Sequence, residues 1–416
     1  MTITHILNIQ DHPIIYCSDN IKKRYIIGLG CILHRVSNGH PDMKLLFEQW
    51  GYSILKENVG MWFNPSEESC ISNALKLNRR ELHFFRVKHQ FYFDCFYLTE
   101  TFNKSLLDSL HALLKEFGCN IFTKSSLTRT YNFFKDHNAT LKVDESLQRH
   151  RSENITFSSQ TEKRILIVAT VSAGKSTLIN ALTGHYFNKA KNGVCTNHIC
   201  TIHNKRKHDG ITFRNGTTLI YDSEIDVHSS DNIYDCAFHF ESTLGDTRIC
   251  LIDTPGVNNA NNSEHLNETS DAIKAKNYDV IIFISNGQYN GTNDELRLLK
   301  LLKETTNKPI LFVLNQLDKF NNKVDDIGKM ICNYSNELVT VGFKNPMIFP
   351  ISAQYAYFLR SEHNLDEEET DELNMLRTRF SKEYLDLKRY SGGESTSDIE
   401  KSGIIQLEQA IKKQII

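Results

Sequence analysis

Short apolar runs alternate with helical patterns in the second half of the chain. The runs RILIVAT, TRICLIDTPG, YDVIIFIS, KPILFVLNQLD and PMIFPISA are rich in β-branched residues, and Gly, Pro, Asn or Asp bounds each of them. Runs of this length and composition predict buried strands. Helical patterns, such as residues 292–306, lie between several of these runs. This alternation predicts an α/β fold with a mostly parallel sheet and helices on both faces.

Residues 1–150 have a different pattern, and we expect a separate N-terminal domain that is either α+β or mainly helical. The stretch QFYFDCFYLTE, residues 90–100, is aromatic and partly alternating, which indicates a strand. Residues 103–118 repeat leucine at spacings of three and four and end at a glycine, which predicts a helix. No catalytic constellation stands out here, so the sequence assigns this domain no role.

The remaining segments complete the expected organisation. The polar segment 151–163 is expected to link the N-terminal domain to a second domain, 164–416. The runs NHICTIHNKR and YDCAFHFES flank a polar excursion, 206–234, and predict an antiparallel edge hairpin with an insertion. Residues 363–400 are expected to form a charged helical insertion, and residues 403–415 a final short helix.

Composition and charge narrow the class of protein. A hydrophobic content of 40% and a charged content of 24% are typical of soluble globular proteins. The net charge of −2 lacks the basic excess that accompanies nucleic-acid binding, so we expect no nucleic-acid partner. Neither a signal peptide nor a run of ~20 apolar residues is visible, which predicts a cytoplasmic protein. Peripheral membrane contact stays open, although no feature supports it.

The ten cysteines include no C-x-x-C pair. Cys195 and Cys200 are the two closest, and neither a second pair nor a histidine set at zinc spacing accompanies them. We therefore expect scattered, reduced thiols.

The stretch ATVSAGKST, residues 169–177, directly follows the first of the predicted strands. It matches the phosphate-loop pattern G-x-x-x-x-G-K-[ST], except that Ala169 replaces the first glycine. A strand, a glycine-containing turn and a helix aim backbone N–H groups at one point, where the helix dipole adds positive potential. Lys175 is expected to reach the outer phosphates and Ser176 to bind Mg²⁺. The other expected phosphate contacts are Ser172, Ala173, Gly174 and Thr177.

Two further elements are expected near the phosphates. In CLIDTPGV an apolar strand ends at Asp253, which would hold Mg²⁺ through water opposite Ser176. Gly256 lets the backbone approach the terminal phosphate. Thr196 lies in a loop before the next strand and is expected to close on the γ-phosphate and Mg²⁺. Each of these short motifs is common on its own, but their order after the phosphate loop supports a nucleotide site.

The last elements predict recognition of guanine. LFVLNQLDKF is a strand followed by N-Q-x-D, and Asp318 offers two oxygens to the N1–H and the 2-amino group of guanine. Asn315 is expected to fix the loop and face the base edge, while Gln316 stands where lysine is usual. In FPISAQYA, the backbone amides of Ser352 and Ala353 are expected to meet guanine O6.

In this order, the elements resemble those of P-loop GTPases of the translation-factor and Ras-like class. Within it, VSAGKSTLINALTG, DTPGVNN, NQLDKF and PISA look like the bacterial dynamin family, over about residues 160–416. The resemblance implies a P-loop NTPase G domain that binds GTP and GDP, uses Mg²⁺ and hydrolyses GTP to GDP and phosphate. It also implies that Ser172 contacts a charge-compensating cation and the γ-phosphate, that Thr196 is the switch I threonine, and that both act with Lys175 in catalysis.

The sequence departs from these families in ways that leave alternatives open. No glutamine follows DTPG where Ras-like enzymes orient the attacking water, so the resemblance implies activation by a G-domain homodimer or by pairing with another dynamin-like chain. Ala169 and Val171 leave the rate of turnover open. The alternatives are a GTP-binding switch or scaffold with little hydrolysis, a ribosome-associated GTPase of another class, and an ATP-dependent enzyme. The helical stalk of dynamin-like proteins does not follow, so membrane remodelling is not implied.

Overall fold

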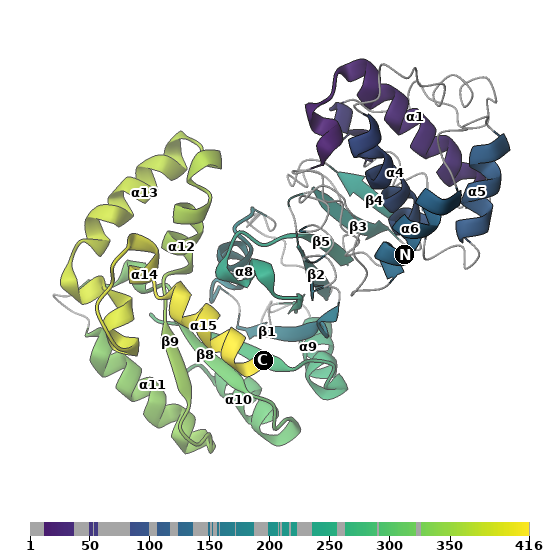
Figure 1. The fold of residues 1–416 in the computed structure, drawn as a ribbon. Coiled ribbons are helices and arrows are strands. Elements are labelled where there is room, and N and C mark those ends of the chain that lie inside the picture. Colours follow the sequence, from purple (N-terminus) through teal and green to yellow (C-terminus); the bar gives the residue numbers. More distant parts are fainter. Residues whose placement is uncertain are drawn as a thin grey trace. The chain divides into compact units, whose positions relative to one another are not determined.

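We describe a computed structural model of the 416-residue chain, whose helices and strands are drawn in Figure 1. The chain divides into two compact units, residues 1–159 with 207–223, and residues 160–206 with 224–416. Part of the polar excursion therefore groups with the N-terminal residues. Apart from a few isolated residues, the structure describes residues 12–36, 50–52, 54–56, 84–99, 106–116, 124–135, 159–170, 172–186, 199–206, 211–215, 218–222, 235–255, 263–288, 291–321 and 326–415.

The described part of the first unit is mainly helical. Its α-helices pack around a core formed by aromatic and aliphatic side chains such as Tyr25, Leu29, Trp50, Phe91 and Phe96. A two-stranded antiparallel hairpin also belongs to this unit. The elements are η1 (Pro13–Tyr16), α1 (Asp19–Val36), α4 (Phe84–Thr99), α5 (Leu106–Glu116), α6 (Lys124–Lys135), β3 (Ile211–Asn215) and β4 (Thr218–Asp222).

The strand predicted over 90–100 is wrong, because this stretch lies in helix α4. Residues 91–96 are all buried, so both alternate positions of the run face the protein interior. A helix buried on most sides has no polar face, and an aromatic run of that kind imitates a strand. The helix predicted over 103–118 is confirmed as α5.

The second unit is an α/β sheet, as predicted. Its strands lie in the order β5-β2-β6-β1-β7-β8-β9, and the five from β6 to β9 are parallel. Strand β2 runs antiparallel to β6. The strands are β1 (Lys163–Ala169), β2 (Cys200–Lys205), β5 (Asp235–His239), β6 (Ile249–Asp253), β7 (Val280–Asn286), β8 (Ile310–Asn315) and β9 (Met347–Pro350).

The antiparallel hairpin predicted between β2 and β5 is wrong. These strands pair in parallel, with Ile202 opposite Cys236. A hairpin needs a short connection, whereas the excursion between the two strands is long enough to return the chain to the starting end of the sheet. The hairpin in this region is β3–β4 instead, within the excursion itself.

Helices cover both faces of the sheet (Figure 1). On one face, Ile273 of α9, Leu298 of α10 and Leu338 of α11 pack against alternate sheet residues such as Leu166 and Phe283. On the other face, α8 contacts β1 and α12, and α15 contacts β7, β8 and α8. The α-helices are α8 (Lys175–Thr183), α9 (Ser263–Ala275), α10 (Asn293–Thr305), α11 (Ile327–Val341), α12 (Ala353–Arg360), α13 (Glu367–Phe380), α14 (Asp398–Lys401) and α15 (Ile404–Ile415).

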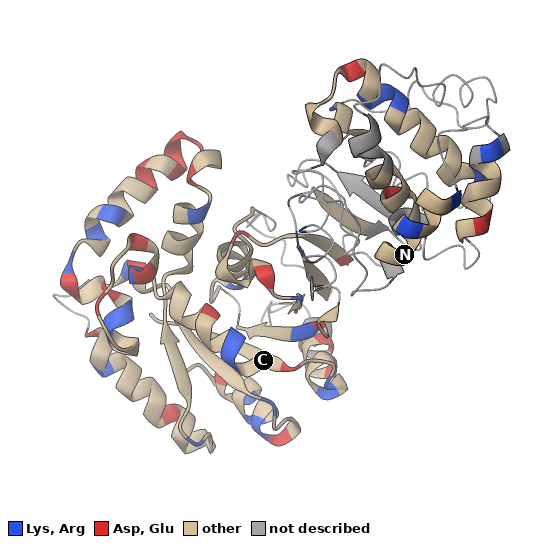
Figure 2. Cartoon of the chain, viewed as in Figure 1, with Lys and Arg blue, Asp and Glu red and all other residues tan. Residues whose placement is uncertain are grey.

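The charged segment that follows α12 contains several short elements. Helix α13 begins with a capping box between Asp366 and Glu369, starts acidic and ends basic, as Figure 2 shows. It ends at Phe380, whose ring stacks on Tyr355 at 4.2 Å between centroids. The 3₁₀ turns of the unit are η3 (Thr243–Asp246), η4 (Leu317–Lys319), η5 (Glu362–Asn364), η6 (Glu383–Leu385) and η7 (Leu387–Ser391).

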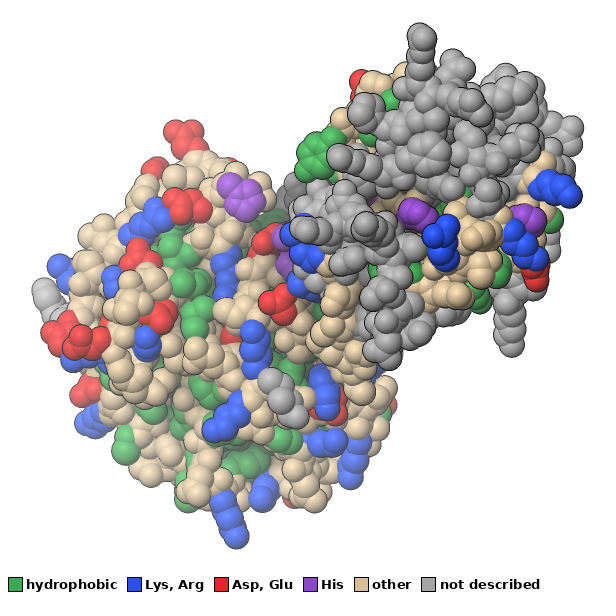
Figure 3. All heavy atoms as spheres, in the orientation of Figure 1, with side chains coloured by type: hydrophobic (Ala, Val, Ile, Leu, Met, Phe, Trp, Pro, Cys, Tyr) green, Lys and Arg blue, Asp and Glu red, His purple; other side chains and the backbone are tan. Residues whose placement is uncertain are grey.

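Acidic and basic side chains are interspersed on the face of the second unit that Figure 3 shows. No helix in the described ranges has the length and apolar character needed to cross a membrane.

Candidate nucleotide-binding site

Most of the motif residues that the structure describes lie at one edge of the sheet. Ala169 is the last residue of β1, Asp253 of β6 and Asn315 of β8. Ser352 lies two residues after the end of β9. These strands are parallel, so their carboxyl ends meet at the same edge, which is where open α/β sheets bind ligands. The predicted residues Thr196 and Gly256, and Val171, lie outside the described residues.

The phosphate loop has the backbone shape of an anion-binding turn. Ser172 and Gly174 both have a left-handed backbone, with φ of 61° and 85°. Gly174 is the N-cap of α8, and its carbonyl accepts the first helical hydrogen bond from Leu178 at 2.9 Å. Turns of this kind expose successive backbone N–H groups, and the helix N-terminus adds positive potential. Ser176 and Thr177 lie half-buried in the first turn of α8.

Side-chain amides from neighbouring strands hold the carbonyl groups of this loop. Asn315 donates to the Ala173 carbonyl at 3.0 Å, and Gln316 donates to the Ser172 carbonyl at 2.6 Å. Asn286, at the end of β7, donates to the same Ser172 carbonyl at 3.4 Å. These carbonyls therefore point toward the β7 and β8 loops. Sequence reasoning missed Asn286, although its position at the end of an apolar strand was a signal.

Gln316 stands where lysine is usual and has a structural role in this loop. Changing Gln316 to alanine removes one hydrogen bond to the phosphate loop, and we expect the free energy of unfolding to fall by about 0.5–1.5 kcal/mol. Affinity for GTP should fall less than about 10-fold, since Asn315 still holds the neighbouring carbonyl. Chemical denaturation and calorimetry measure both quantities. A loss as large as that caused by changing Asp318 would contradict this secondary role.

The backbone at Ala169 does not need glycine. Ala169 is extended, pairs with Ile284 of β7 and is 1% exposed. Its backbone φ is not positive. The conformational freedom of glycine is therefore not used here, and the alanine methyl group fills space in the sheet.

We expect Ala169→Gly to lower the free energy of unfolding by about 0.5–1 kcal/mol, because glycine in a strand loses more backbone entropy on folding. Affinity for GTP and the rate of hydrolysis should stay within about twofold of the parent protein. Thermal denaturation and a single-turnover assay test this. Faster hydrolysis with unchanged affinity would show that the methyl group restrains the loop after all.

A buried ion pair joins the phosphate loop to β6. The Lys175 ammonium group contacts the Asp253 carboxylate, and their side chains are 8% and 0% exposed. Thr254, the next residue, donates its hydroxyl proton to the Ile167 carbonyl of β1 at 2.8 Å. Both groups are removed from water, and each charge compensates the other. A bound phosphate would compete for Lys175 and leave Asp253 facing a metal ion on the nucleotide.

The loop that begins at the end of β8, residues 315–318, would face the base, and we call it the base loop. It is held from β8 and from the start of α12. Ser352 caps α12 and donates its hydroxyl proton to Asp318 at 2.7 Å. The Ala353 amide donates to the Asn315 side chain at 3.0 Å, and Gln316 turns the chain with a left-handed φ of 66°. Asp318 and Asn315 thus keep fixed positions at the end of β8.

The Ser352 and Ala353 amides, which the sequence predicts to meet guanine O6, have partners within the protein. The Ser352 N–H donates to the Ser402 carbonyl at 2.9 Å, and the Ala353 N–H is bonded to Asn315. Both amides hold the loop together here. The carbonyl of Pro350 lies so close to Gly403, which has a φ of 79°, that an added Cβ would come within 2.1 Å of it. The start of α15 is therefore packed against the base loop.

Helix α13 also contacts this loop. Arg379 donates to the Phe320 carbonyl at 2.7 Å. Burial, followed by the neighbouring Asp318 and Glu369 carboxylates, raises the pKa of Glu372. The charged segment after α12 thus places an acidic group near the candidate base-recognition carboxylate.

Comparisons with known proteins find similarity to GTPases over the part of the chain that contains this site. Residues 165–317 match the model of the dynamin family. GTPase Der from Karelsulcia muelleri (strain GWSS) is 27% identical over 222 residues, 52% of this chain and 41% of that protein. The chain thus spans well under half of that relative's length.

Solved structures show weaker similarity. Era from Aquifex aeolicus, bound to GDP and AlF₄⁻, is 18% identical with a TM-score of 0.31, over 52% of this chain and 57% of that one. A chain of an oligomerised bacterial dynamin pair is 14% identical with a TM-score of 0.37, over 98% of this chain and 74% of that one. The segment that the dynamin-family model matches contains the phosphate loop, β6 and β8, so this part of the second unit is similar to the G domain of that family.

Proposed function

We propose that this chain binds GTP together with Mg²⁺ and hydrolyses it to GDP and phosphate. The observation that supports this most directly is the position of two buried pairs at one sheet edge. Lys175 with Asp253 lies where phosphates would bind, and Asp318 with Ser352 lies where the base would bind. The hydrogen bond from Asn315 to the Ala173 carbonyl links the two regions.

Each motif residue then has a role. The backbone from Ser172 to Ser176 and the Lys175 ammonium group hold the phosphates. Ser176, Thr196 and Asp253 organise Mg²⁺. Gly256 would let the backbone approach the γ-phosphate, and Thr177 would contact the phosphates from the first turn of α8. Asn315 positions the loop, and Asp318 accepts two hydrogen bonds from guanine.

Hydrolysis by such a site depends on positioning a water molecule and stabilising charge around the γ-phosphate. The DTPG motif is not followed by glutamine, so another group must fulfil that role. We propose that Ser172 and Thr196 contribute, and that a second G domain completes the site across the nucleotide. This partner is a second copy or another dynamin-like chain.

The test is a single-turnover GTPase assay with Mg²⁺ over a wide range of protein concentrations. Specific activity should rise with concentration, and removal of Mg²⁺ by a chelator should abolish it. A constant specific activity would contradict activation by dimerisation while retaining hydrolysis. Tight GTP binding without hydrolysis at any concentration would favour the switch or scaffold instead.

We further propose that the protein acts in the cytoplasm and without nucleic acid. The net charge of −2 and the presence of both acidic and basic side chains on the face that Figure 3 shows support the absence of a nucleic-acid partner. Sedimentation with ribosomes would revive the alternative of a ribosome-associated GTPase. Tighter binding of ATP than GTP in calorimetry would contradict the guanine assignment.

A further inference from the structure

A histidine, a cysteine and two carboxylates come together in the second unit, away from the phosphate loop. Glu162 directly precedes β1, His203 lies in β2, Asp235 begins β5 and Cys250 lies in β6. His203 is directly opposite Cys250 in the antiparallel β2–β6 pair. Cys250 is three residues before Asp253, so the cluster lies about 10 Å along the strand from the candidate Mg²⁺ ligand.

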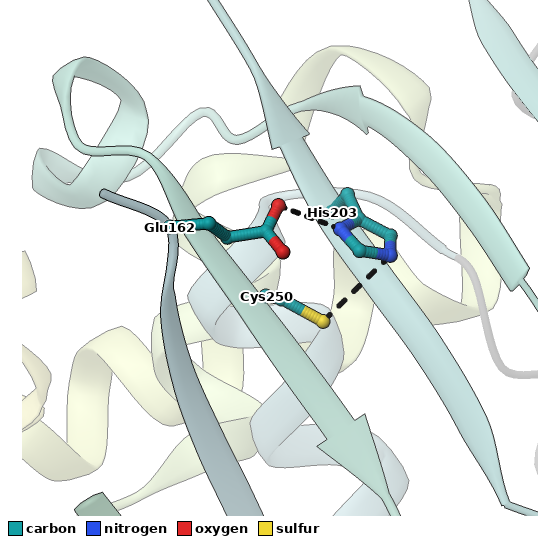
Figure 4. Close-up of side chains that lie close together, drawn as sticks. All are labelled: Glu162, His203 and Cys250. Atoms are coloured by element: carbon teal, nitrogen blue, oxygen red, sulfur yellow. Dashed lines mark hydrogen bonds and ion pairs between the residues drawn. The ribbon is translucent and has the colours of Figure 1, made fainter. Parts of the chain in front are cut away.

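Figure 4 shows the Glu162 carboxylate and the Cys250 thiol beside the His203 ring. Nδ1 of His203 is 2.8 Å from Oε1 of Glu162. Its Nε2 is 3.0 Å from Oδ1 of Asp235 and 3.8 Å from Sγ of Cys250. Ligand atoms of Glu162, His203 and Cys250 all lie within 4.8 Å of one another. One ring nitrogen therefore faces a thiol and a carboxylate, while the other faces a second carboxylate.

These separations fit a tetrahedral metal site. Zinc bonds of about 2.0–2.3 Å at tetrahedral angles place two ligand atoms about 3.4–3.7 Å apart. The Nε2–Sγ and Nε2–Oδ1 distances of 3.8 and 3.0 Å lie on either side of this range. Asp235 is not among the residues whose ligand atoms all lie within 4.8 Å of one another, so its carboxylate must rotate toward Cys250 to complete the site. Cys250 is buried, but the side chains of His203 and Asp235 are 12% and 21% exposed, which gives an ion access.

Glu162 is better placed to orient the ring than to bind the ion. Its carboxylate contacts Nδ1, whereas Cys250 and Asp235 contact Nε2. A metal-bound histidine commonly donates its second N–H to such a carboxylate. Burial alone would raise the pKa of Glu162, but the hydrogen bond to His203, with the charges of His203, Arg248 and Arg164, lowers it.

The same groups bind a proton in the metal-free protein. Burial alone would lower the pKa of His203, but hydrogen bonds to Asp235, Cys250 and Glu162 raise it to about 11. The ring is then a cation between two carboxylates. A divalent ion that binds Nε2 must therefore displace this proton.

We propose that Sγ of Cys250, Nε2 of His203 and Oδ1 of Asp235 bind one Zn²⁺ or a similar thiophilic divalent cation, with Glu162 holding His203 through Nδ1–H. Binding releases the thiol proton of Cys250 and the Nε2 proton of His203 to solvent, and no electron is transferred. Water completes the coordination. The ion would join β2, β5 and β6, and so fix the strand that follows the segment containing Thr196. The proposal is independent of GTP hydrolysis.

The test uses the full chain, stripped of metal with a chelator and titrated with Co²⁺. A single equivalent should produce the absorption of a thiolate bound to Co²⁺, and Zn²⁺ should displace it. Cys250→Ser should abolish this absorption, whereas the matched change of the exposed Cys332 to serine should keep it. His203→Gln should lower affinity far more than His363→Gln, a change at an exposed histidine.

A further set of variants separates binding from folding. Glu162→Gln should keep the thiolate absorption but weaken the affinity for Co²⁺ about 10- to 100-fold. Zn²⁺ should raise the melting temperature of the parent protein and not that of Asp235→Asn, even if Cys250→Ser fails to fold. Absence of thiolate absorption in the parent would overturn the proposal and leave His203 as a buried ion pair. Absorption that survives in Cys250→Ser would overturn it by placing the thiolate elsewhere.

Discussion

Lys175→Ala should reduce single-turnover GTP hydrolysis by about 100- to 1,000-fold, because it removes a charge that would act on the developing transition state. The structure adds a second consequence. Asp253 is 0% exposed, so without Lys175 its buried carboxylate loses this cation. Breaking a buried pair in this way costs about 3–5 kcal/mol, so the nucleotide-free variant should also unfold more easily. A single-turnover hydrolysis assay measures the first effect, and chemical denaturation measures the second.

A double variant distinguishes these effects. Lys175→Ala combined with Asp253→Ala removes both charges, so stability should largely recover while hydrolysis stays as low as in Lys175→Ala. The exposed Lys308 provides a matched control, and its change to alanine should alter neither quantity. Full activity in Lys175→Ala would contradict the phosphate-binding role. An unchanged free energy of unfolding would contradict the importance of the ion pair in the nucleotide-free state.

Asp318→Asn should change the base preference of the site. The carboxylate would accept two hydrogen bonds from guanine, and each bond to a charged group contributes about 1.5–3 kcal/mol. Their loss should weaken GTP binding about 100- to 10,000-fold. Xanthine has a carbonyl group where guanine has the 2-amino group, and a side-chain amide can donate to it. Affinity for xanthosine triphosphate should therefore rise as affinity for GTP falls, which calorimetry can measure for both nucleotides.

The position of Asp318 makes this a conservative change for the loop. Ser352 donates its hydroxyl proton to Oδ1 of Asp318, and an amide oxygen can accept the same bond. The exposed Asp371 is the matched control, since its change to asparagine also removes one negative charge. Equal loss of both nucleotides in Asp318→Asn would indicate a collapsed loop. Unchanged GTP affinity would show that Asp318 does not contact the base.

The sequence predicted the parallel sheet and the edge at which the motifs meet, because each motif follows an apolar run and parallel strands end together. It could not predict α4, since a helix buried on most sides lacks the polar face that reveals its period. The parallel pairing of β2 with β5 depends on how the long excursion returns, which no local pattern encodes. Asn286 was missed because its partner, the Ser172 carbonyl, is a backbone group distant in sequence.

The cluster around His203 was missed for a related reason. The cysteine spacing predicted scattered thiols, and spacing detects only ligands that are close in sequence. Glu162, His203, Asp235 and Cys250 come from different strands or strand starts, and only the strand order brings them together. The Co²⁺ titration distinguishes the expected scattered thiols from the proposed metal site.

The contact between α15 and the base loop has a mechanical consequence. The Ser402 carbonyl accepts the Ser352 amide, and the close approach of Gly403 to Pro350 leaves no room for the two segments to slide. A force or a partner that pulls on α15 would therefore shift the residues that fix Asp318. Because coupling between two sites is reciprocal, occupancy of the base loop would change the resistance of α15 to the same pull by an equal free energy.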